Sequence, residues 1–174
     1  MLRTDIFRKT ILFFTGSLVS NSTFFDVIYL LFRLHLGLSI SIQAGWPKLF
    51  SNIRDKDKEI LELGVPEWFV SQVSELGFKF PSPTFWAYIA TYGEFIGGLL
   101  LALGLFTRLN ALQLTIQFFV IAFIWYEGVE PIVGMYFQQL FFFSYLLIFG
   151  HGSGRYSLDR LIFSKEQERA TGKI

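Results

Sequence analysis

Residues 29–50 are the most informative stretch for the fold class, and they read YLLFRLHLGLSISIQAGWPKLF. Arg33 and Lys48 are its only charged side chains, and the run is long enough for a helix to cross the ~30 Å hydrocarbon core of a bilayer. A soluble surface helix of this length carries a charged or polar face. The stretch therefore predicts a transmembrane helix with an ionisable group in its interior.

The rest of the chain has the same character. Residues 81–126 contain only Glu94 and Arg108 as charged groups, and residues 131–150 contain no Asp, Glu, Lys or Arg. Of the 174 residues, 52% are hydrophobic and 17% are charged, and the mean hydropathy is +0.47. A soluble helical protein with an aromatic core is the alternative, but its surface would need more charge. We therefore expect an integral membrane protein.

The apolar runs and their breaks predict an all-α protein, a membrane four-helix bundle. Its transmembrane helices are expected at residues 24–50, 84–106, 109–126 and 132–149. Apolar residues recur at mostly helical spacing in residues 63–80, which predicts an amphipathic helix on the membrane surface. Pro83 follows a break in the chain and suits a helix start.

Three segments follow from this pattern. Residues 1–23 form an N-terminal cytoplasmic segment that we interpret as a retained interfacial helix, although its basic residues and short apolar run imitate a signal peptide. Residues 24–161 form the transmembrane domain, with an outer loop at 51–83. Residues 162–174 form a polar cytoplasmic tail.

The distribution of Lys and Arg predicts the orientation. Basic residues dominate the N-terminus, the turn at Arg108 and the C-terminal tail, whereas acids outnumber bases in the opposite loops. The positive-inside rule then places both termini in the cytoplasm. We expect a multi-pass protein of the bacterial cytoplasmic membrane.

Two opposite charges lie far from the predicted helix ends. At ~1.5 Å per residue, Arg33 and Glu94 are each about 14–15 Å into the bilayer on consecutive helices. An unpaired charge at that depth costs at least ~2.5–3.5 kcal/mol. Small residues spaced along both helices allow close backbone approach; they are Gly37, Ser41 and Gly45 on the first helix and Gly93, Gly97 and Gly98 on the second. We therefore hypothesise that Arg33 and Glu94 pair inside the bundle and are the candidate catalytic groups.

Further polar side chains accompany this predicted pair. Gln113 and Gln117 share one face of the third helix, His35 lies near the midplane, and Tyr92 is close to Glu94 in sequence. Together with Arg33 and Glu94, we expect His35, Gln117 and Tyr92 to line a polar cavity for a small head group. Two interpretations stay open, because an intramembrane ion pair can be structural only or can form a ligand or proton site.

Composition excludes several chemistries. The chain has no cysteine, so it supplies neither disulfides nor thiolate ligands for metals or iron–sulfur clusters. The two histidines, His35 and His151, are expected at different depths, which is unfavourable for haem ligation. No metal site, Gly-rich phosphate loop or nucleic-acid-binding basic patch is predicted.

Several short motifs resemble the DoxX family of small four-helix membrane proteins. They are Arg33 with Gly37 and then 45–49 (GWPKL), 94–98 (EFIGG) followed by 104–108 (GLFTR), and 152–159 (GSGRYSLD). The resemblance spans roughly residues 29–161, and the charged insert at 51–62 is longer than the family's usual loop. It implies structural roles for Gly37, Lys48, Gly97, Gly98, Gly104 and Asp159.

The resemblance also carries a functional expectation. The family is named after subunits of thiosulfate:quinone oxidoreductase, which implies a quinone-associated redox subunit with a non-covalently bound quinone and a membrane protein partner. Whether the chain is an enzyme stays open; if it is, it is an oxidoreductase subunit acting on a quinone. The alternative is a non-enzymatic scaffold or assembly factor, because distant relatives include a receptor chaperone. A small-solute transporter is a weaker third interpretation, since no inverted repeat supports it.

Overall fold

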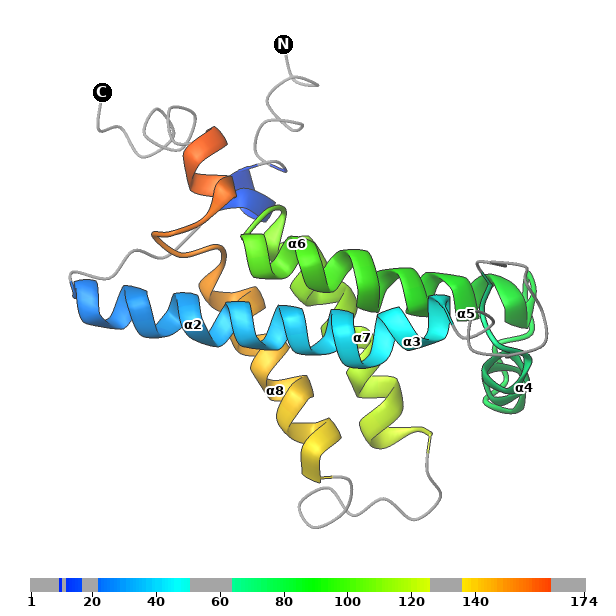
Figure 1. Cartoon of the computed structure of the whole chain (residues 1–174). Helices are drawn as coiled ribbons and strands as arrows, with labels where there is room; N and C mark the ends of the chain where they lie inside the picture. The colour runs from blue at the N-terminus through cyan, green and yellow to red at the C-terminus, as the bar shows by residue number, and fades with distance from the viewer. Residues whose placement is uncertain (1–9, 11, 17–21, 51–63, 126–135, 164–174) are drawn as a thin grey trace.

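The structure is a computed structural model that describes residues 10, 12–16, 22–50, 64–125 and 136–163 (Figure 1). Most of the predicted N-terminal segment, the charged insert, the start of the fourth predicted helix and the polar tail lie outside the described residues. The described residues form helices and turns. The predicted all-α class is therefore confirmed.

The first long helical unit runs without a break through three elements: α2 (Thr23–Ile40), η1 (Ser41–Gly45) and α3 (Trp46–Leu49). The Ser22 hydroxyl caps its start by accepting a hydrogen bond from the Phe25 N–H at 3.4 Å. Asp26 in the first turn places negative charge at the positive end of the helix dipole. The predicted bounds, 24–50, agree with the structure to within one residue.

The second long unit also has three elements: α5 (Pro83–Tyr92), η3 (Gly93–Gly97) and α6 (Gly98–Leu103). Pro83 occupies the first turn and the Ser82 hydroxyl accepts from the Phe85 N–H at 3.1 Å, as the sequence signal for a helix start predicts. Gly104 ends the unit in the left-handed conformation, with φ of 72°. Thr23–Leu49 and Pro83–Leu103 are the two candidate membrane spans within the described residues.

The third and fourth long helices are α7 (Thr107–Phe123) and α8 (Tyr136–His151). Both ends of α7 and the end of α8 lie within three residues of their predicted bounds, and the two helices pack along each other. Their described lengths are 17 and 16 residues, which is shorter than the ~20 residues that a helix needs to cross the hydrocarbon core. Four membrane crossings therefore stay a prediction, and two candidate spans are what the structure shows.

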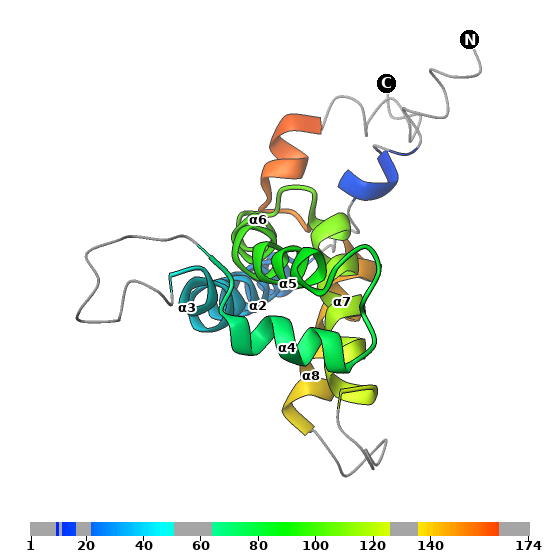
Figure 2. The ribbon, with the colours of Figure 1, turned by 90° about the vertical axis from the view of Figure 1, so that its right-hand side faces the viewer.

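The four units form two antiparallel pairs that cross each other steeply (Figures 1 and 2). The α2–α3 unit lies beside the α5–α6 unit, while α7 and α8 run across them. Helix α4 (Glu67–Glu75) is the predicted amphipathic helix, and it buries Phe69 and Val73 against Ala87 of α5. α4 therefore packs against α5, at the end of α5 that is distant from α6 (Figures 1 and 2).

Small residues set the register between the two candidate spans. A Cβ added at Gly37 would lie 2.5 Å from the Gly98 carbonyl oxygen, and one added at Gly45 would lie 2.5 Å from the Phe95 nitrogen. The backbones can approach this closely only because both positions lack a side chain. The predicted close packing of the two helices is confirmed for Gly37, Gly45 and Gly98, whereas Gly93 and Gly97 face Gln113 of α7 and not the first helix.

Both candidate spans contain a π-helical turn at this contact. η1 and η3 face each other, and the Ser41 hydroxyl donates to the Phe95 carbonyl oxygen at 2.9 Å. A π-helical turn carries one extra residue, and the Phe95 carbonyl in η3 accepts from Ser41 in addition to the Gly98 N–H. Such turns are rare and frequent at functional sites, and Glu94 lies inside η3.

Candidate functional site

A polar cluster surrounds Glu94 in the interior of the protein. The Lys48 Nζ lies 2.7 Å from Oε2 and 2.9 Å from Oε1 of Glu94. The Gln117 side-chain amide donates to Glu94 Oε1 at 2.7 Å, and the Gln113 amide donates to the Gln117 oxygen at 2.9 Å. Three elements therefore meet here: α3 supplies the lysine, η3 the carboxylate and α7 both amides.

Burial makes this cluster electrostatically strong. The side chain of Glu94 is 2% exposed and that of Lys48 is 17% exposed. Nζ of Lys48 also lies 4.4 Å from the centre of the Phe69 ring, a cation–π contact from α4. Lys48 therefore contacts both the Glu94 carboxylate and the Phe69 ring of α4.

An apolar groove opens beside this cluster between α4, α5 and α7. Its cavity volume is about 510 Å³, within the ~300–1,000 Å³ of small-molecule sites. Lys48, Gln72, Gln113 and Gln117 supply its polar groups. The remaining lining is aliphatic and aromatic: Trp68, Phe69, Val73, Leu76, Phe78, Trp86, Ile89, Ala90, Leu109, Leu112, Ile116, Val120, Ile121 and Trp125.

Gly93 makes room for the amide of Gln113 at the edge of the groove. A Cβ added at Gly93 would collide with that amide, so the Gln113 side chain would have to move away from its present position. The Gln113 side-chain oxygen is buried and has no hydrogen-bond partner among the described residues. A buried amide oxygen without a donor is an unused acceptor of the kind found at binding sites.

The predicted pairing of Arg33 with Glu94 is wrong. Arg33 is buried, with 1% of its surface exposed, but its guanidinium donates to the backbone carbonyl oxygens of Ser153 and Tyr156, the latter at 2.8 Å. Glu94 takes Lys48 as its ion-pair partner instead. Both charges are buried as predicted, but they belong to different clusters.

The register of the two helices explains the error. Gly45 lies against Phe95, the neighbour of Glu94, and Arg33 precedes Gly45 by twelve residues, or about 18 Å along a helix. Arg33 is therefore level with Gly104, whose added Cβ would lie 2.6 Å from the guanidinium. Depths counted from predicted helix ends did not detect this offset.

The second cluster is built around the segment 152–160, which we call the C-terminal latch. Arg33 holds it from α2, and Asp159 fastens it to the start of α7 by accepting from the Phe106 and Thr107 N–H groups at 2.7 and 2.9 Å. The Asp159 N–H in turn donates to the Gly104 carbonyl oxygen at 2.9 Å. Burial raises the pKa of the Asp159 carboxyl above its usual range, against the opposing effect of these N–H donors and Arg33.

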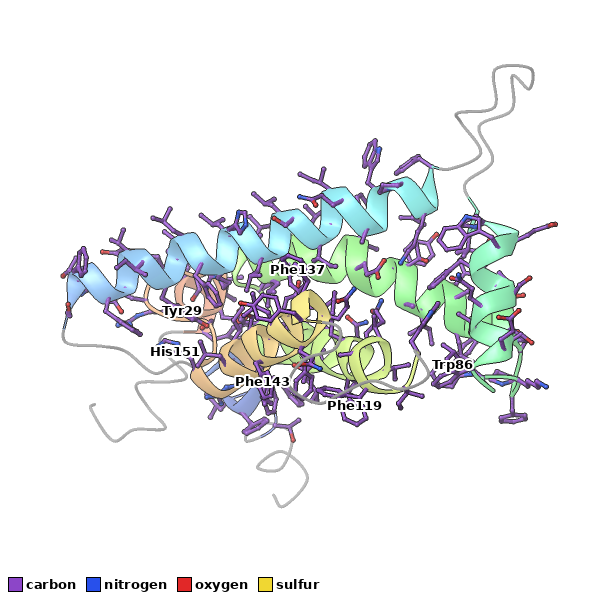
Figure 3. The ribbon with its side chains drawn as sticks, turned by 90° about the horizontal axis from the view of Figure 1, so that it is seen from below. Tyr29, Trp86, Phe119, Phe137, Phe143 and His151 are labelled. Carbon is purple, nitrogen blue, oxygen red and sulfur yellow. The ribbon has the colours of Figure 1, made fainter. Side chains whose placement is uncertain are left out.

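The latch also contacts the described part of the N-terminal segment. Residues 12–15 are helical, and Arg108 donates to the carbonyl oxygens of Phe13 at 2.8 Å and Gly150 at 3.3 Å. The hydroxyl of Tyr29 donates to the Gly152 carbonyl oxygen at 2.5 Å, and its ring lies against His151 (Figure 3). The N-terminal segment, the Arg108 turn and the end of α8 therefore share one end of the molecule, as predicted.

The structure brings together only some of the predicted site residues. Gln117 contacts Glu94, but His35 lies exposed on α2. Tyr92 is 42% exposed and stacks on Tyr88, outside the polar cluster. Lys48, to which the resemblance assigned only a structural role, is the ion-pair partner of Glu94. Lys48 follows Gly45 by three residues, and Gly45 lies against Phe95, so a correct register between the two helices would have predicted this pair.

Comparison with known proteins gives one match. The family model for DoxX matches residues 28–127, which include most of α2 together with Lys48, Glu94 and Gln117. Curated proteins and solved structures gave no match. The matched region covers more than half of the chain and includes most of the first candidate membrane span and all of the second, so this protein belongs to the DoxX family.

Proposed function

We propose that this protein is a quinone-associated redox subunit that holds a quinone in the apolar groove, with its head group at the Lys48–Glu94–Gln117 cluster. The observation that carries the proposal is the position of this buried ion pair at the edge of a groove that is otherwise apolar. A long hydrocarbon body fits the lining, and a head group with oxygen atoms fits the polar edge.

The donor set suits such a head group. Lys48 Nζ and the side-chain amide groups of Gln72, Gln113 and Gln117 line the groove, and ammonium and amide groups donate hydrogen bonds to carbonyl oxygens. The unpartnered oxygen of Gln113 is an additional acceptor close by. The residues present therefore fit a quinone.

The residues of this chain would have distinct tasks. Lys48 would orient the head group by donating a hydrogen bond to it. Glu94 would position the lysine through the ion pair and would be the nearest carboxylate that can accept a proton. Gln117 would position the Glu94 carboxylate through its hydrogen bond. A bound quinone would supply reversible two-electron, two-proton chemistry. The described residues contain no group of three or more His, Cys, Asp or Glu side chains that could hold a metal ion, and the chain has no cysteine. We therefore propose that a membrane protein partner supplies the electrons.

Quinone extraction tests the proposal. Protein purified in mild detergent is extracted with organic solvent, and quinone is measured by mass spectrometry per mole of protein. We expect near-stoichiometric quinone in the wild type and a loss of about tenfold in Ile89→Trp, which fills the groove. Ile96→Trp, at an exposed position of the same helix outside the groove, is the matched control. A wild-type protein that never carries quinone contradicts the proposal.

A scaffold or assembly subunit is the second candidate, and the aromatic surface of α8 favours it. Phe137 and Phe143 are 70% and 58% exposed, and several aromatic side chains surround them (Figure 3). Lipid or a partner helix would cover such a surface equally well. A co-purifying membrane protein together with the absence of quinone would support this candidate over the first.

The membrane context is also proposed in detail. The two candidate spans and the family membership support a membrane protein. We propose the bacterial cytoplasmic membrane with both termini in the cytoplasm, because Lys and Arg are concentrated in the two terminal segments of the sequence and at the Arg108 turn. Reporter fusions at each terminus and in the outer loop test this orientation.

A further inference from the structure

We propose that the groove selects amphiphiles with an uncharged head group, and that Glu94 is the residue that excludes anionic ones. This inference rests on the proposed function only in taking the groove as a ligand site. It adds a rule of specificity: quinones and other neutral lipids enter, whereas fatty acids and acidic phospholipids do not.

The charges around the groove carry the argument. Among the described residues that line it, Lys48 is the one charged side chain. Its ammonium is matched by Glu94, which lies 2.7 Å away and is almost fully buried. The two charges of this pair therefore balance each other, although the ammonium remains a strong hydrogen-bond donor.

An anionic head group would approach two opposite charges at once. Attraction to Lys48 would be offset by repulsion from the Glu94 carboxylate directly behind it, while the anion would lose its hydration on entering the apolar groove. A neutral carbonyl or ester needs only one donor and loses little hydration. Neutral amphiphiles are thus favoured over anionic ones of the same shape.

The same reasoning predicts how selectivity can be reversed. Glu94→Gln removes the carboxylate that lies 2.7 Å from the Lys48 ammonium and would repel an anion, so an anionic head group becomes the better ligand. Ile116→Lys has the same effect by a second route. It adds a cation at an exposed position of the groove lining and leaves the Lys48–Glu94 pair intact.

Tryptophan fluorescence can measure this selectivity, because Trp68, Trp86 and Trp125 line the groove. A single-tryptophan variant that keeps Trp125 reports on the groove. A second variant that keeps only Trp46, which packs against Phe50 and Phe95, reports on surrounding detergent and lipid. The probes are dibromostearate and its methyl ester at alkaline pH; they share one body, both quench tryptophan, and they differ in charge.

In the Trp125 reporter with the native pair, we expect the methyl ester to bind about tenfold more tightly than the carboxylate, the equivalent of ~1.4 kcal/mol. In Glu94→Gln, or in Ile116→Lys if the first variant does not fold, the carboxylate should bind more tightly than the ester. The Trp46 reporter should show no such reversal.

Equal binding of the two probes, or an unchanged order in a folded variant, would overturn the inference. A short-tailed quinone tested on the same Trp125 reporter separates this failure from that of the proposed function. Quenching by the quinone without charge selectivity contradicts the specificity rule alone. No quenching by any of the three probes contradicts both.

Discussion

Lys48 and Glu94 show how two charges can be kept away from water. Taking a carboxylate out of water costs several kcal/mol, and a cation at hydrogen-bond distance offsets much of this cost. Here the carboxylate receives hydrogen bonds from both Lys48 and Gln117, so its two oxygens are satisfied. The stability of the pair depends on both partners being present.

Removing one member of the pair should therefore cost more than removing both. We expect Lys48→Met to lower the free energy of unfolding by about 3 kcal/mol, because it leaves Glu94 buried without a cation. The double variant Lys48→Met with Glu94→Leu should regain most of that loss. Denaturant titration in detergent micelles, followed by circular dichroism, measures both; a Lys48→Met protein as stable as the wild type would show that the pair contributes nothing.

Asp159 gives a pH dependence whose sign follows from its environment. Burial raises the pKa of this carboxyl in the folded state above its ordinary value of 3.8, so the folded protein binds the proton more tightly than the unfolded chain does. The contribution of protonated Asp159 to stability is fully present below about pH 4 and is lost as the pH rises through the raised pKa. Asp159→Asn removes this titration.

Melting temperatures measured in steps from pH 4 to pH 7 check this expectation. The wild type should lose stability relative to Asp159→Asn as the pH increases over this interval. If the difference between the two proteins stays constant or changes in the opposite direction, the desolvation of Asp159 does not control its ionisation.

At the scale of elements, the two π-helical turns set how the candidate spans meet. η1 presents Gly45 and Ser41 to η3, and a Cβ at Gly45 would lie 2.5–2.7 Å from backbone and Cβ atoms of Phe95. Backbone atoms inside a helix have little room to retreat, so this contact is intolerant of added volume. The register that joins Lys48 to Glu94 depends on it.

Gly45→Ala should therefore destabilise the protein by about 1–3 kcal/mol, the usual cost of overpacking. Gly150→Ala is the matched control, because Gly150 is also helical and no atom lies within 4 Å of its added Cβ. That change should be neutral or stabilising by up to about 1 kcal/mol. Equal effects of the two changes would contradict the close packing of η1 on η3.

The sequence predicts the elements better than it predicts their partners. Apolar runs and Pro83 mark the helices within a few residues, since these signals are local. The partner of Arg33 is not local: it is a pair of backbone carbonyl groups about 120 residues downstream, and backbone acceptors have no signature in a sequence. The predicted pairing of Arg33 with Glu94 is wrong because Gly45, not Arg33, lies level with η3, and Arg33 is about 18 Å further along the helix.

At the scale of the whole molecule, the C-terminal latch joins parts of the chain that are far apart in sequence. Arg33 from α2, the turn before α7 and the segment after α8 meet there. Two guanidinium nitrogens of Arg33 each donate to a backbone carbonyl oxygen of the latch. The latch therefore supplies hydrogen-bond acceptors for this buried charged group. Its removal should affect the entire fold.

Truncation tests this dependence. A chain that ends after His151 lacks the latch, and we expect its accumulation in membranes to fall at least about tenfold, because Arg33 is left buried without acceptors. A chain that ends after Phe163 keeps the latch and should accumulate like the full-length protein. Quantitative immunoblotting of membrane fractions distinguishes them, and equal accumulation of the two would show that the latch is dispensable.

The position of the latch also has a consequence for biosynthesis. Arg33 leaves the ribosome 120 residues before Ser153, which at about 5–20 residues per second is a delay on the order of 6–24 s. During this time the nascent first helix carries a guanidinium whose final acceptors have not been translated. Helix α2 therefore acquires the final hydrogen-bond partners of Arg33 only after the C-terminal latch has been translated.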